Sequence, residues 1–404
     1  QDRQGPHERP GSRPGTLSFP LPIPDEVRRL LPPGTGVLLG LSGGVDSALC
    51  LALLDHLGCD VRTVTFKNFC YSEDERVMTE KSCCSLDAIE DARRLARRFD
   101  AQHWVGDVAE PFKQAVMDPF VAEYGRARTP NPCLDCNGTV RFPELVRLAE
   151  RQGCAFAATG HYARVEDGRL LRGIDPDKDQ SYFLHRVPPE TFDHLVFPLG
   201  WYTKPQVRDA AAELGLSVAT KRDSQEICFV PDGDRTFLFA DEAVDPRSLE
   251  PGDIVDAAGQ VLGRHRGLIH YTVGQRRGLG VAAPDPLYVL KLDLEGGRLV
   301  VGAKDDLLTS SLAADGFRPA VAGFPDRWAA GDPTFPEGVT ARIRHRHAGV
   351  PVASLSRTGN ALTLEFAEPV DGPAPGQAVV LYHGDVVLGG GVIGVSGLGE
   401  ARHG

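Results

Sequence analysis

The sequence predicts an α/β fold in which a doubly wound parallel sheet is followed by two small β domains. Across residues 36–216, apolar runs of strand length alternate with helical patterns, which is typical of a parallel sheet covered by helices on both faces. From about residue 223, short alternating runs between Gly and Pro turns indicate antiparallel β units. The predicted segments are a disordered N-terminal extension (1–35), the α/β domain (36–222), a small central β-rich domain (223–306) and a C-terminal β-barrel domain (307–404).

The composition narrows the class of protein. The 404 residues are enough for two or three domains, and the formal net charge of −11 argues against a generic nucleic-acid coat. A local basic surface can still contact one RNA. No apolar run is long enough to cross a bilayer and no signal segment opens the chain, so we expect a soluble cytoplasmic protein. The polar, Pro- and Gly-rich start indicates disorder, with a transit-peptide remnant as the alternative.

The first predicted strand-to-helix connection carries the clearest functional signal. The apolar run GVLLGL leads into SGGVDS, and the leucines of ALCLALLDHL then have helical spacing. A Gly-Gly pair lets backbone amides approach a ligand, Ser42 and Ser47 add hydroxyl donors, and a helix N-terminus attracts anions, so the turn suits a phosphate. A bare Gly-Gly pair would more simply be a capped turn. The turn lacks the Lys of the GxxxxGK[ST] loop, which excludes that motor and GTPase signature.

The later elements follow in order. VRTVTF and QHWVGDV predict the second and third strands, DAIEDARRLARRF and PELVRLAERQG predict helices, and CAFAATG predicts another strand. PLYVLKLD and RLVVGAK indicate strands of the central domain, and QAVVLYHGDVVLGGGVI indicates strands of the C-terminal domain. In the C-terminal stretch RIRHRH, a strand would place Arg342, Arg344 and Arg346 on one face, where they could follow an RNA backbone. A solvated strand face is the alternative.

Nine cysteines occur, all before residue 229, and an odd number favours reactive or metal-binding thiols over a disulfide framework. Cys133 and Cys136 form a C-x-x-C pair, and Cys228 lies far along the chain. A lone C-x-x-C fits a redox pair, half a zinc site, or two cysteines in a turn. Cys83 and Cys84, near a predicted helix start, are either dipole-favoured thiolates or small buried residues. The cysteines in apolar contexts, which we assign to packing, are Cys50, Cys59 and Cys154, while Cys70 stays unassigned.

Eight motifs in order resemble a tRNA-specific 2-thiouridylase, and SGGVDS resembles the pyrophosphate loop of ATP pyrophosphatases. The motifs are GLSGGVDS, GRARTPNPCLDCNGTVRF, ATGHYARV, LLRGIDPDKDQSYFL, FPLGWYTKPQVRDAAAELGL, KRDSQEICFV, GRHRGLIHYTVGQRRGLG and PGQAVVLYHGDVVLGGGVI. The resemblance implies ATP-dependent replacement of the C2 oxygen of the wobble uridine by sulfur in the tRNAs for Lys, Glu and Gln. It also implies a sulfur donor such as a cysteine desulfurase or a sulfur relay protein, and a tRNA-binding role for the central domain.

The resemblance assigns the ATP site. In that pattern the loop residues hold the polyphosphate, Mg2+ screens its charge, Phe66 meets the adenine edge, and Gly160 contacts the nucleotide from another strand end. A core aromatic is the plain alternative for Phe66, although its place at the carboxyl end of a strand favours the site. The implied nucleotide-binding residues are Gly40, Leu41, Ser42, Gly43, Gly44, Val45, Asp46, Ser47, Phe66 and Gly160.

The resemblance also assigns the sulfur chemistry, with one departure. It implies that Cys228 carries a persulfide and that Cys136 is the nucleophile that attacks or resolves it. Many relatives have Asp where this chain has Cys133. With Cys there, the thiolates of Cys133, Cys136 and Cys228 could instead hold a [4Fe-4S] cluster whose open iron binds sulfide. A zinc site would need a fourth ligand such as Cys83, Cys84 or His161, and the persulfide and cluster routes both stay open.

Further residues match the tRNA contacts of the family. Asn131 and Cys133 would lie near the target base, which must leave its stack to react. The composition of the loop with Lys178, Asp179 and Gln180 would by itself indicate a solvated turn, and the charge of the arginines would by itself indicate exposed surface. A lone histidine such as His161 is more often structural. The remaining implied contacts are His161, Lys178, Asp179, Gln180, Arg344, His345 and Gln377, and Arg276 and Arg277 could meet phosphates. A C–N-bond-forming ATP pyrophosphatase would leave the cysteines unexplained, and a sulfur carrier or metal-sensing RNA-binding protein would show no turnover.

Overall fold

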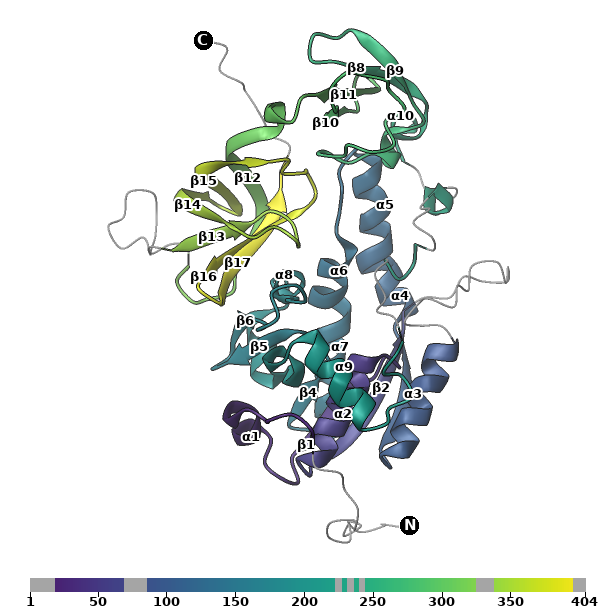
Figure 1. The fold of residues 1–404 in the computed structure, drawn as a ribbon, viewed down its shortest axis with the longest axis vertical. Coiled ribbons are helices and arrows are strands. Elements are labelled where there is room, and N and C mark those ends of the chain that lie inside the picture. Colours follow the sequence, from purple (N-terminus) through teal and green to yellow (C-terminus); the bar gives the residue numbers. More distant parts are fainter. Residues whose placement is uncertain are drawn as a thin grey trace.

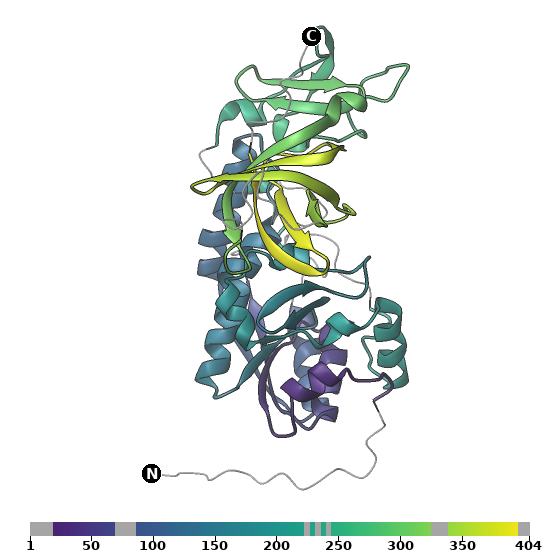
Figure 2. The ribbon, with the colours of Figure 1, turned by 90° about the vertical axis from the view of Figure 1, so that its left-hand side faces the viewer.

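The computed structural model describes residues 19–68, 86–221, 227–230, 236–239, 244–324 and 338–394. The α/β domain lies at one end of the elongated molecule and the small central β domain at the other, and the C-terminal barrel lies between them (Figures 1 and 2). Within the described residues, no helix combines the length and the apolar character needed to cross a membrane.

The α/β domain is built on a parallel sheet, as predicted. The strand order is β3-β2-β1-β4-β7, and every neighbouring pair is parallel. β1 is central and buried on both faces, which explains why its sequence is a continuous apolar run rather than an alternating one. The strands of this sheet are β1 (Gly36–Gly40), β2 (Asp60–Lys67), β3 (Gln102–Asp107), β4 (Phe156–Ala158) and β7 (Leu195–Val196).

Helices cover both faces of this sheet, which confirms the doubly wound prediction. Successive residues of a strand point to opposite faces. Leu39 therefore packs in one apolar cluster with Leu53 and Val207, whereas Leu38 packs in a second cluster with Leu145. The helices of the first cluster are α1 (Asp25–Leu30), α2 (Val45–His56), α3 (Leu86–Arg98) and α9 (Lys204–Glu213), and α7 (Phe142–Arg151) belongs to the second.

The predicted disordered extension is too long. Residues 1–18 lie outside the described residues, but residues 19–35 are part of the α/β domain. Phe19, Ile23, Val27 and Leu31 are buried in its core. Their spacing of four residues is the apolar signal that the Pro-rich surroundings masked.

Two interrupted helices lead from the sheet toward the rest of the molecule. The first consists of α4 (Ala109–Phe112), the π-helical segment η2 (Lys113–Met117) and α5 (Asp118–Gly125). The second consists of α6 (Pro132–Asp135), the π-helical segment η3 (Cys136–Arg141) and α7. Short π-helical segments are frequent at functional sites, and η3 begins at one of the predicted reactive thiols.

The C-terminal domain is a closed barrel, as predicted. Its strands follow the order β12-β15-β14-β13-β16-β17, and β12 also pairs with β17, which closes the ring. The barrel strands are β12 (Leu308–Pro319), β13 (Val339–Arg342), β14 (Val350–Thr358), β15 (Ala361–Asp371), β16 (Ala378–His383) and β17 (Val386–Ile393). A hairpin of the α/β domain, β5 (Ala163–Glu166) and β6 (Arg169–Arg172), extends this sheet through the pair Leu171–Val386.

The central domain holds a small sheet of order β10-β11-β8-β9. Its pairs are antiparallel except β11–β8, which is parallel. Its strands are β8 (Gly252–Val255), β9 (Val261–His265), β10 (Tyr288–Asp293) and β11 (Arg298–Gly302). The short helices of the described chain are α8 (Ser181–Leu184), η4 (Pro189–His194), η5 (Pro198–Trp201), η7 (Thr236–Phe239), α10 (Pro246–Leu249), η8 (Leu268–His270) and η9 (Asp305–Leu307).

Candidate nucleotide and thiol site

The SGGVDS turn joins the carboxyl end of β1 to the N-terminus of α2. Ser47 Oγ accepts a hydrogen bond from the Ser42 N–H at 3.2 Å and donates one to the Gly44 carbonyl at 3.1 Å. Gly43 has φ +70°, and a Cβ there would lie 2.6 Å from the Ala88 carbonyl oxygen. Only glycine fits this position. The turn is thus held open with the helix N-terminus behind it, an arrangement that suits an anion.

Gly160 and Phe66 lie next to this turn at neighbouring strand ends. A Cβ on Gly160 would lie 2.8 Å from the Asp46 carbonyl carbon and 2.9 Å from the Ser47 nitrogen, so the chain after β4 presses against the start of α2. Phe66 is half-buried near the end of β2, the strand beside β1. The Leu41 N–H bonds the Val64 carbonyl at 2.8 Å, which ties the loop to the same strand. The predicted nucleotide residues are thus brought together, and their contacts with ATP stay a prediction.

Asp46 has two side-chain partners that the sequence did not reveal. Lys204 Nζ donates to both carboxylate oxygens at 2.7 Å, and the Tyr162 hydroxyl donates to Oδ1 at 2.7 Å. The Lys204 side chain is 7% exposed and that of Asp46 is 31% exposed. One feature of the sequence could have pointed to Lys204. It is the first residue of a helix, a position where the helix dipole disfavours a cation.

The thiols of Cys136 and Cys228 belong to one apolar cluster, although they are far apart in the sequence. Cys136 is buried, Cys228 is half-buried, and Phe66 packs against the same cluster. Phe229, the neighbour of Cys228, packs edge-on against Phe112 and Phe120, with ring centroids 5.6 and 5.2 Å apart. The cluster places both predicted sulfur-handling residues beside the strand end that borders the nucleotide loop.

Cys133 differs from these two thiols because it is exposed. Its N–H donates to Asn131 Oδ1 at 3.2 Å, which caps α6. Asp135, between the two cysteines of the C-x-x-C pair, forms an ion pair with Arg186, while burial raises the pKa of its carboxyl group. Among the described cysteines none is in a disulfide bond.

The thiols do not fit the predicted metal alternatives. In the ranges that the structure describes, no three His, Cys, Asp or Glu side chains form a group that could hold a metal ion. The expected [4Fe-4S] ligand set of Cys133, Cys136 and Cys228 is therefore not formed, because one thiol faces solvent and another is buried. A zinc site with His161 as fourth ligand is not formed either, because the described residues contain no such group of ligands. Cys70, Cys83 and Cys84 lie outside the described residues. Mg2+ carried by ATP needs only one or two carboxylates from the protein, and Asp46 can supply one.

The cysteines assigned to packing are buried in the core, which confirms that prediction. Cys50, Cys59 and Cys154 are 0%, 2% and 8% exposed. Burial, with a smaller effect of Asp55, raises the pKa of Cys59 to about 11, and burial raises that of Cys50 further. These groups are protonated at neutral pH and are poor nucleophiles.

His161 is held as a neutral imidazole next to the nucleotide loop. Burial, assisted by Arg141, lowers its pKa to about 3. Its Nδ1 lies 2.7 Å from Thr159 Oγ1, and its ring packs against Phe142 and Phe197. A neutral ring can accept or donate one hydrogen bond but offers no positive charge to a phosphate. Its contact with tRNA stays a prediction.

Asp179 stabilises the loop of Lys178, Asp179 and Gln180 that is predicted to contact tRNA. Asp179 is 2% exposed, accepts the N–H groups of Gly173 and Ser181, and forms an ion pair with Arg342 at 2.7 Å. Lys178 and Gln180 are half-buried beside it. Asp179 therefore supports the loop from within, and the RNA contacts of Lys178, Asp179 and Gln180 stay predictions.

The expected arginine row of RIRHRH is wrong. β13 ends at Arg342, so Arg344 and Arg346 lie beyond the strand and are exposed, whereas Arg342 is buried against Asp179. The buried ion pair of Arg342 with Asp179 turns this arginine inward, so the three arginines do not share one exposed face. Arg344 Nη2 bonds Asp371 at 3.1 Å.

His345 and Gln377, the other predicted barrel contacts, lie where the barrel meets the α/β domain. The His345 ring packs 4.4 Å from that of Phe183, and its buried Nδ1 has no hydrogen-bond partner. Gln377 Nε2 donates to the Thr129 carbonyl at 2.7 Å, two residues before Asn131. The barrel thus holds the loop that carries Asn131 and Cys133, and the RNA contacts stay predictions.

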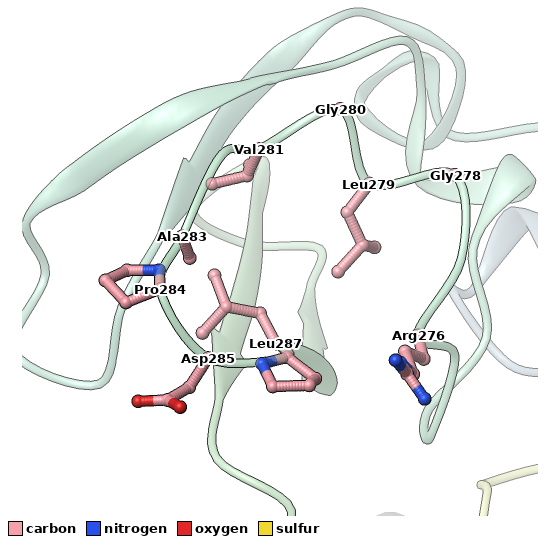
Figure 3. A pocket seen from close by; sticks show the side chains of 10 residues that line it. Arg276, Gly278, Leu279, Gly280, Val281, Ala283, Pro284, Asp285 and Leu287 are labelled. Atoms are coloured by element: carbon pink, nitrogen blue, oxygen red, sulfur yellow. The ribbon is translucent and has the colours of Figure 1, made fainter.

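Arg276 and Arg277 are exposed in the central domain. Arg276 borders a shallow pocket of about 340 Å3 formed with the loop from Gly278 to Leu287 (Figure 3). Neither arginine lies in the nucleotide and thiol site, so a role at phosphates would place RNA across the far end of the molecule.

Three family descriptions match consecutive parts of the chain. They are "tRNA methyl transferase HUP domain" over residues 35–232, "tRNA methyl transferase PRC-barrel domain" over residues 243–303, and "Aminomethyltransferase beta-barrel domain" over residues 325–393. These matches follow the order of the α/β domain, the central sheet and the barrel.

Curated relatives match most of the chain. A protein of Geobacter metallireducens named tRNA-specific 2-thiouridylase MnmA is 45% identical over 88% of this chain and 96% of its own. Proteins of the same name from Zymomonas mobilis and Paramagnetospirillum magneticum are 43% and 41% identical, over 94% and 90% of this chain and 96% of each relative.

Proposed function

Because the chain belongs to the tRNA-specific 2-thiouridylase family, we propose that it uses ATP to replace the C2 oxygen of the wobble uridine of tRNA with sulfur. The observation that carries the proposal is the shared apolar cluster of Cys136, Cys228 and Phe66 beside the SGGVDS loop. Activation by ATP and delivery of sulfur need to occur at one base, and this cluster borders the nucleotide loop.

The first step is activation of the base. A uracil carbonyl is a poor electrophile and its oxygen is a poor leaving group. In the proposed reaction, O2 of the uridine attacks the α-phosphorus of ATP, a bond forms between them, and pyrophosphate leaves. The loop of Ser42, Gly43, Gly44 and Ser47 would hold the polyphosphate, and Asp46 would hold Mg2+, which supplies charge neutralisation on the phosphates.

The second step delivers sulfur. A persulfide on Cys228 is attacked at Cys228 Sγ by the thiolate of Cys136, which forms a Cys136–Cys228 disulfide and releases hydrosulfide. Hydrosulfide attacks C2 of the activated uridine, and AMP leaves with the former O2. The sulfur atom gains two electrons and the two thiols lose two, so an external dithiol must reduce the disulfide before a sulfur donor reloads Cys228.

The surroundings of the thiols suit this step. Both cysteines lie among apolar and aromatic side chains, which limits the access of water to a persulfide and to the activated base. In the proposal, Cys133 and Asn131 at the adjoining helix start border the target base, and the exposure of Cys133 supports a contact with a ligand rather than a core role.

The proposed partners are those that the resemblance to the family implies. We propose the tRNAs for Lys, Glu and Gln as substrates and a cysteine desulfurase or a sulfur relay protein as donor, in the cytoplasm. Because the described thiols do not form a metal-binding group, the persulfide route is the one proposed.

The test is to measure AMP, pyrophosphate and 2-thiouridine with purified protein, ATP, Mg2+ and a sulfur donor, with and without unmodified tRNA. We expect the three products in equal amounts and only with tRNA. Formation of AMP with small amines and without tRNA would instead indicate an amide-forming ATP pyrophosphatase.

A further inference from the structure

Asp46 is part of a polar network that a phosphate-binding loop does not by itself require. Lys204 Nζ lies 2.7 Å from both of its carboxylate oxygens, and the Tyr162 hydroxyl donates to one of them at 2.7 Å. The carboxylate is the more exposed member, 31% against 7% for the Lys204 side chain. The buried ammonium and the phenol therefore hold a carboxylate that still reaches solvent.

Helix formation and packing do not account for a lysine at this place. Lys204 is the first residue of α9, where the positive end of the helix dipole disfavours a cation, and burial of an ammonium is itself unfavourable. The contact with Asp46 is what compensates for both effects. The lysine is thus explained by what it does to Asp46.

Both partners of Asp46 are anchored on the same loop. The Lys204 N–H donates to Asp175 Oδ2 at 2.7 Å, and Asp175 begins the loop of residues 175–180. At the other end of that loop, Gln180 Oε1 accepts the Tyr162 N–H at 2.9 Å and the Gln180 N–H donates to the Tyr162 carbonyl at 2.8 Å. A displacement of this loop is therefore passed to Asp46 along two routes.

We propose that Lys204 is a positioning residue that holds the Asp46 carboxylate toward the Mg2+ of Mg-ATP, and that it makes this orientation depend on loop 175–180. The inference rests on the proposed function, in which Asp46 meets Mg2+ and the loop meets tRNA. It assigns the loop a second task, which is to improve the metal site when RNA is bound.

The first experiment measures equilibrium binding of a non-hydrolysable ATP analogue by calorimetry over a range of Mg2+ concentrations. Loss of a hydrogen bond to a charged group weakens an interaction by about tenfold or more. In Lys204→Met the Asp46 carboxylate loses the two hydrogen bonds from Lys204 that orient it. We expect the cost of reorienting the carboxylate to exceed the gain from removing a nearby positive charge, so the Mg2+ concentration for half-maximal binding should rise by about tenfold. Lys204→Arg should recover most of this effect, and Tyr162→Phe should show a smaller shift in the same direction.

The matched control is Lys113→Met, which breaks another lysine–aspartate pair of 2.7 Å, with Asp118, on the exposed surface. It should bind as the unaltered protein does. Circular dichroism checks that each variant is folded. If Lys204→Met does not fold, Tyr162→Phe carries the test. An Mg2+ dependence that is unchanged in folded Lys204→Met, or in Tyr162→Phe if Lys204→Met does not fold, overturns the proposal.

The second experiment adds unmodified tRNA to the same titration. We expect tRNA to lower the Mg2+ requirement of the unaltered protein and to have no such effect on Lys204→Met. An Mg2+ requirement that tRNA leaves unchanged in the unaltered protein overturns the link to the loop. Absence of AMP formation with tRNA would instead contradict the proposed function, whereas the binding comparison would still report on Lys204.

Discussion

Asp46 and Cys228 separate the two halves of the proposed reaction at the level of single side chains. Asp46 lies in the nucleotide loop, where it pairs with Lys204, whereas Cys228 lies in the apolar cluster with Cys136. Delivery of sulfur should therefore be lost without activation when a thiol is altered, whereas loss of Asp46 should remove activation and, with it, delivery.

We predict that Asp46→Ala abolishes both AMP formation and 2-thiouridine. Cys136→Ser and Cys228→Ser should abolish 2-thiouridine while tRNA-dependent AMP formation stays measurable, because a hydroxyl cannot carry or resolve a persulfide. Quantifying both products for each variant checks the division. Cys154→Ala, which removes a buried packing thiol, is the control, and loss of AMP formation in both serine variants would contradict the separation of roles.

His185 gives a prediction about pH and stability. It is buried, its Nδ1–H donates to the Tyr182 carbonyl at 2.8 Å, and burial lowers its pKa to about 3. In the unfolded chain a histidine binds a proton below about pH 6.5. The folded protein does not bind this proton, so His185 alone should lower the free energy of unfolding by about 1.4 kcal/mol per pH unit as the pH drops from 6 toward 4.

Urea unfolding at pH 7.5, 6 and 5 measures this slope. His185→Asn should reduce it, because the group that titrates only in the unfolded state is gone. The half-buried His103 and His161 have pKa values lowered by burial to about 4 and 3 and add slopes of the same sign. An identical slope in His185→Asn would contradict the assignment.

At the scale of elements, the meeting of α2 with the end of β4 determines the shape of the nucleotide loop. Gly160 has no room for a side chain, since a Cβ would lie 2.8 Å from the Asp46 backbone. The conformation of the nucleotide loop thus depends on Gly160, which lies outside the loop, as well as on the glycines of the loop itself.

We predict that Gly160→Ala displaces the start of α2 and weakens ATP binding by about tenfold or more, at a stability cost of about 1–3 kcal/mol from overpacking. Calorimetry of nucleotide binding and urea unfolding give the two quantities. Gly215→Ala is the comparison: its Cβ meets nothing within 4 Å, although φ there is +60°. It should cost stability without a matching loss of ATP affinity, and equal ATP affinity in both variants would contradict this account.

The elements themselves were largely predictable, and the exceptions have physical causes. β1, β2, β4 and α2 were predicted from apolar runs and helical spacing, because most of their residues are buried. β3 was also predicted although it is largely exposed, whereas the two-residue strand β7 was not predicted. β13 ended early because Arg342 pairs with Asp179 from a distant segment. The helix from Pro132 contains a π-helical segment, η3, which no local pattern specified.

The candidate site was predictable where motifs are contiguous and not where partners come from afar. The loop from Ser42 to Ser47 could be assigned from its own residues. Lys204 and Tyr162 reach Asp46 only through tertiary packing, so neither was assigned to the site from the sequence. The sequence allowed a [4Fe-4S] cluster on Cys133, Cys136 and Cys228. The number and spacing of cysteines do not show which thiols are buried and which are exposed.

At the scale of the whole molecule, the barrel is fastened to the α/β domain by a buried charge pair. Arg342 of β13 and Asp179 are 6% and 2% exposed and 2.7 Å apart. Arg342 also donates to the carbonyls of His345 and His347, so it orders the exposed turn after β13.

Removing one partner leaves an uncompensated buried charge, so we predict that Arg342→Met destabilises the protein by about 3–5 kcal/mol. Asp179→Asn together with Arg342→Met should be less destabilising than Arg342→Met alone, because both charges are gone. Chemical unfolding of the single and double variants measures the coupling. Purely additive losses would show that the pair does not fasten the barrel.

The origin of the transferred sulfur tests the central claim most directly. The protein would be loaded with labelled sulfur from cysteine and a desulfurase, freed of excess donor, and given unmodified tRNA with ATP and Mg2+ for a single turnover. We predict that label leaves the peptide containing Cys228 and appears in 2-thiouridine only when ATP is present. Labelled 2-thiouridine formed equally well by Cys228→Ser would contradict the account.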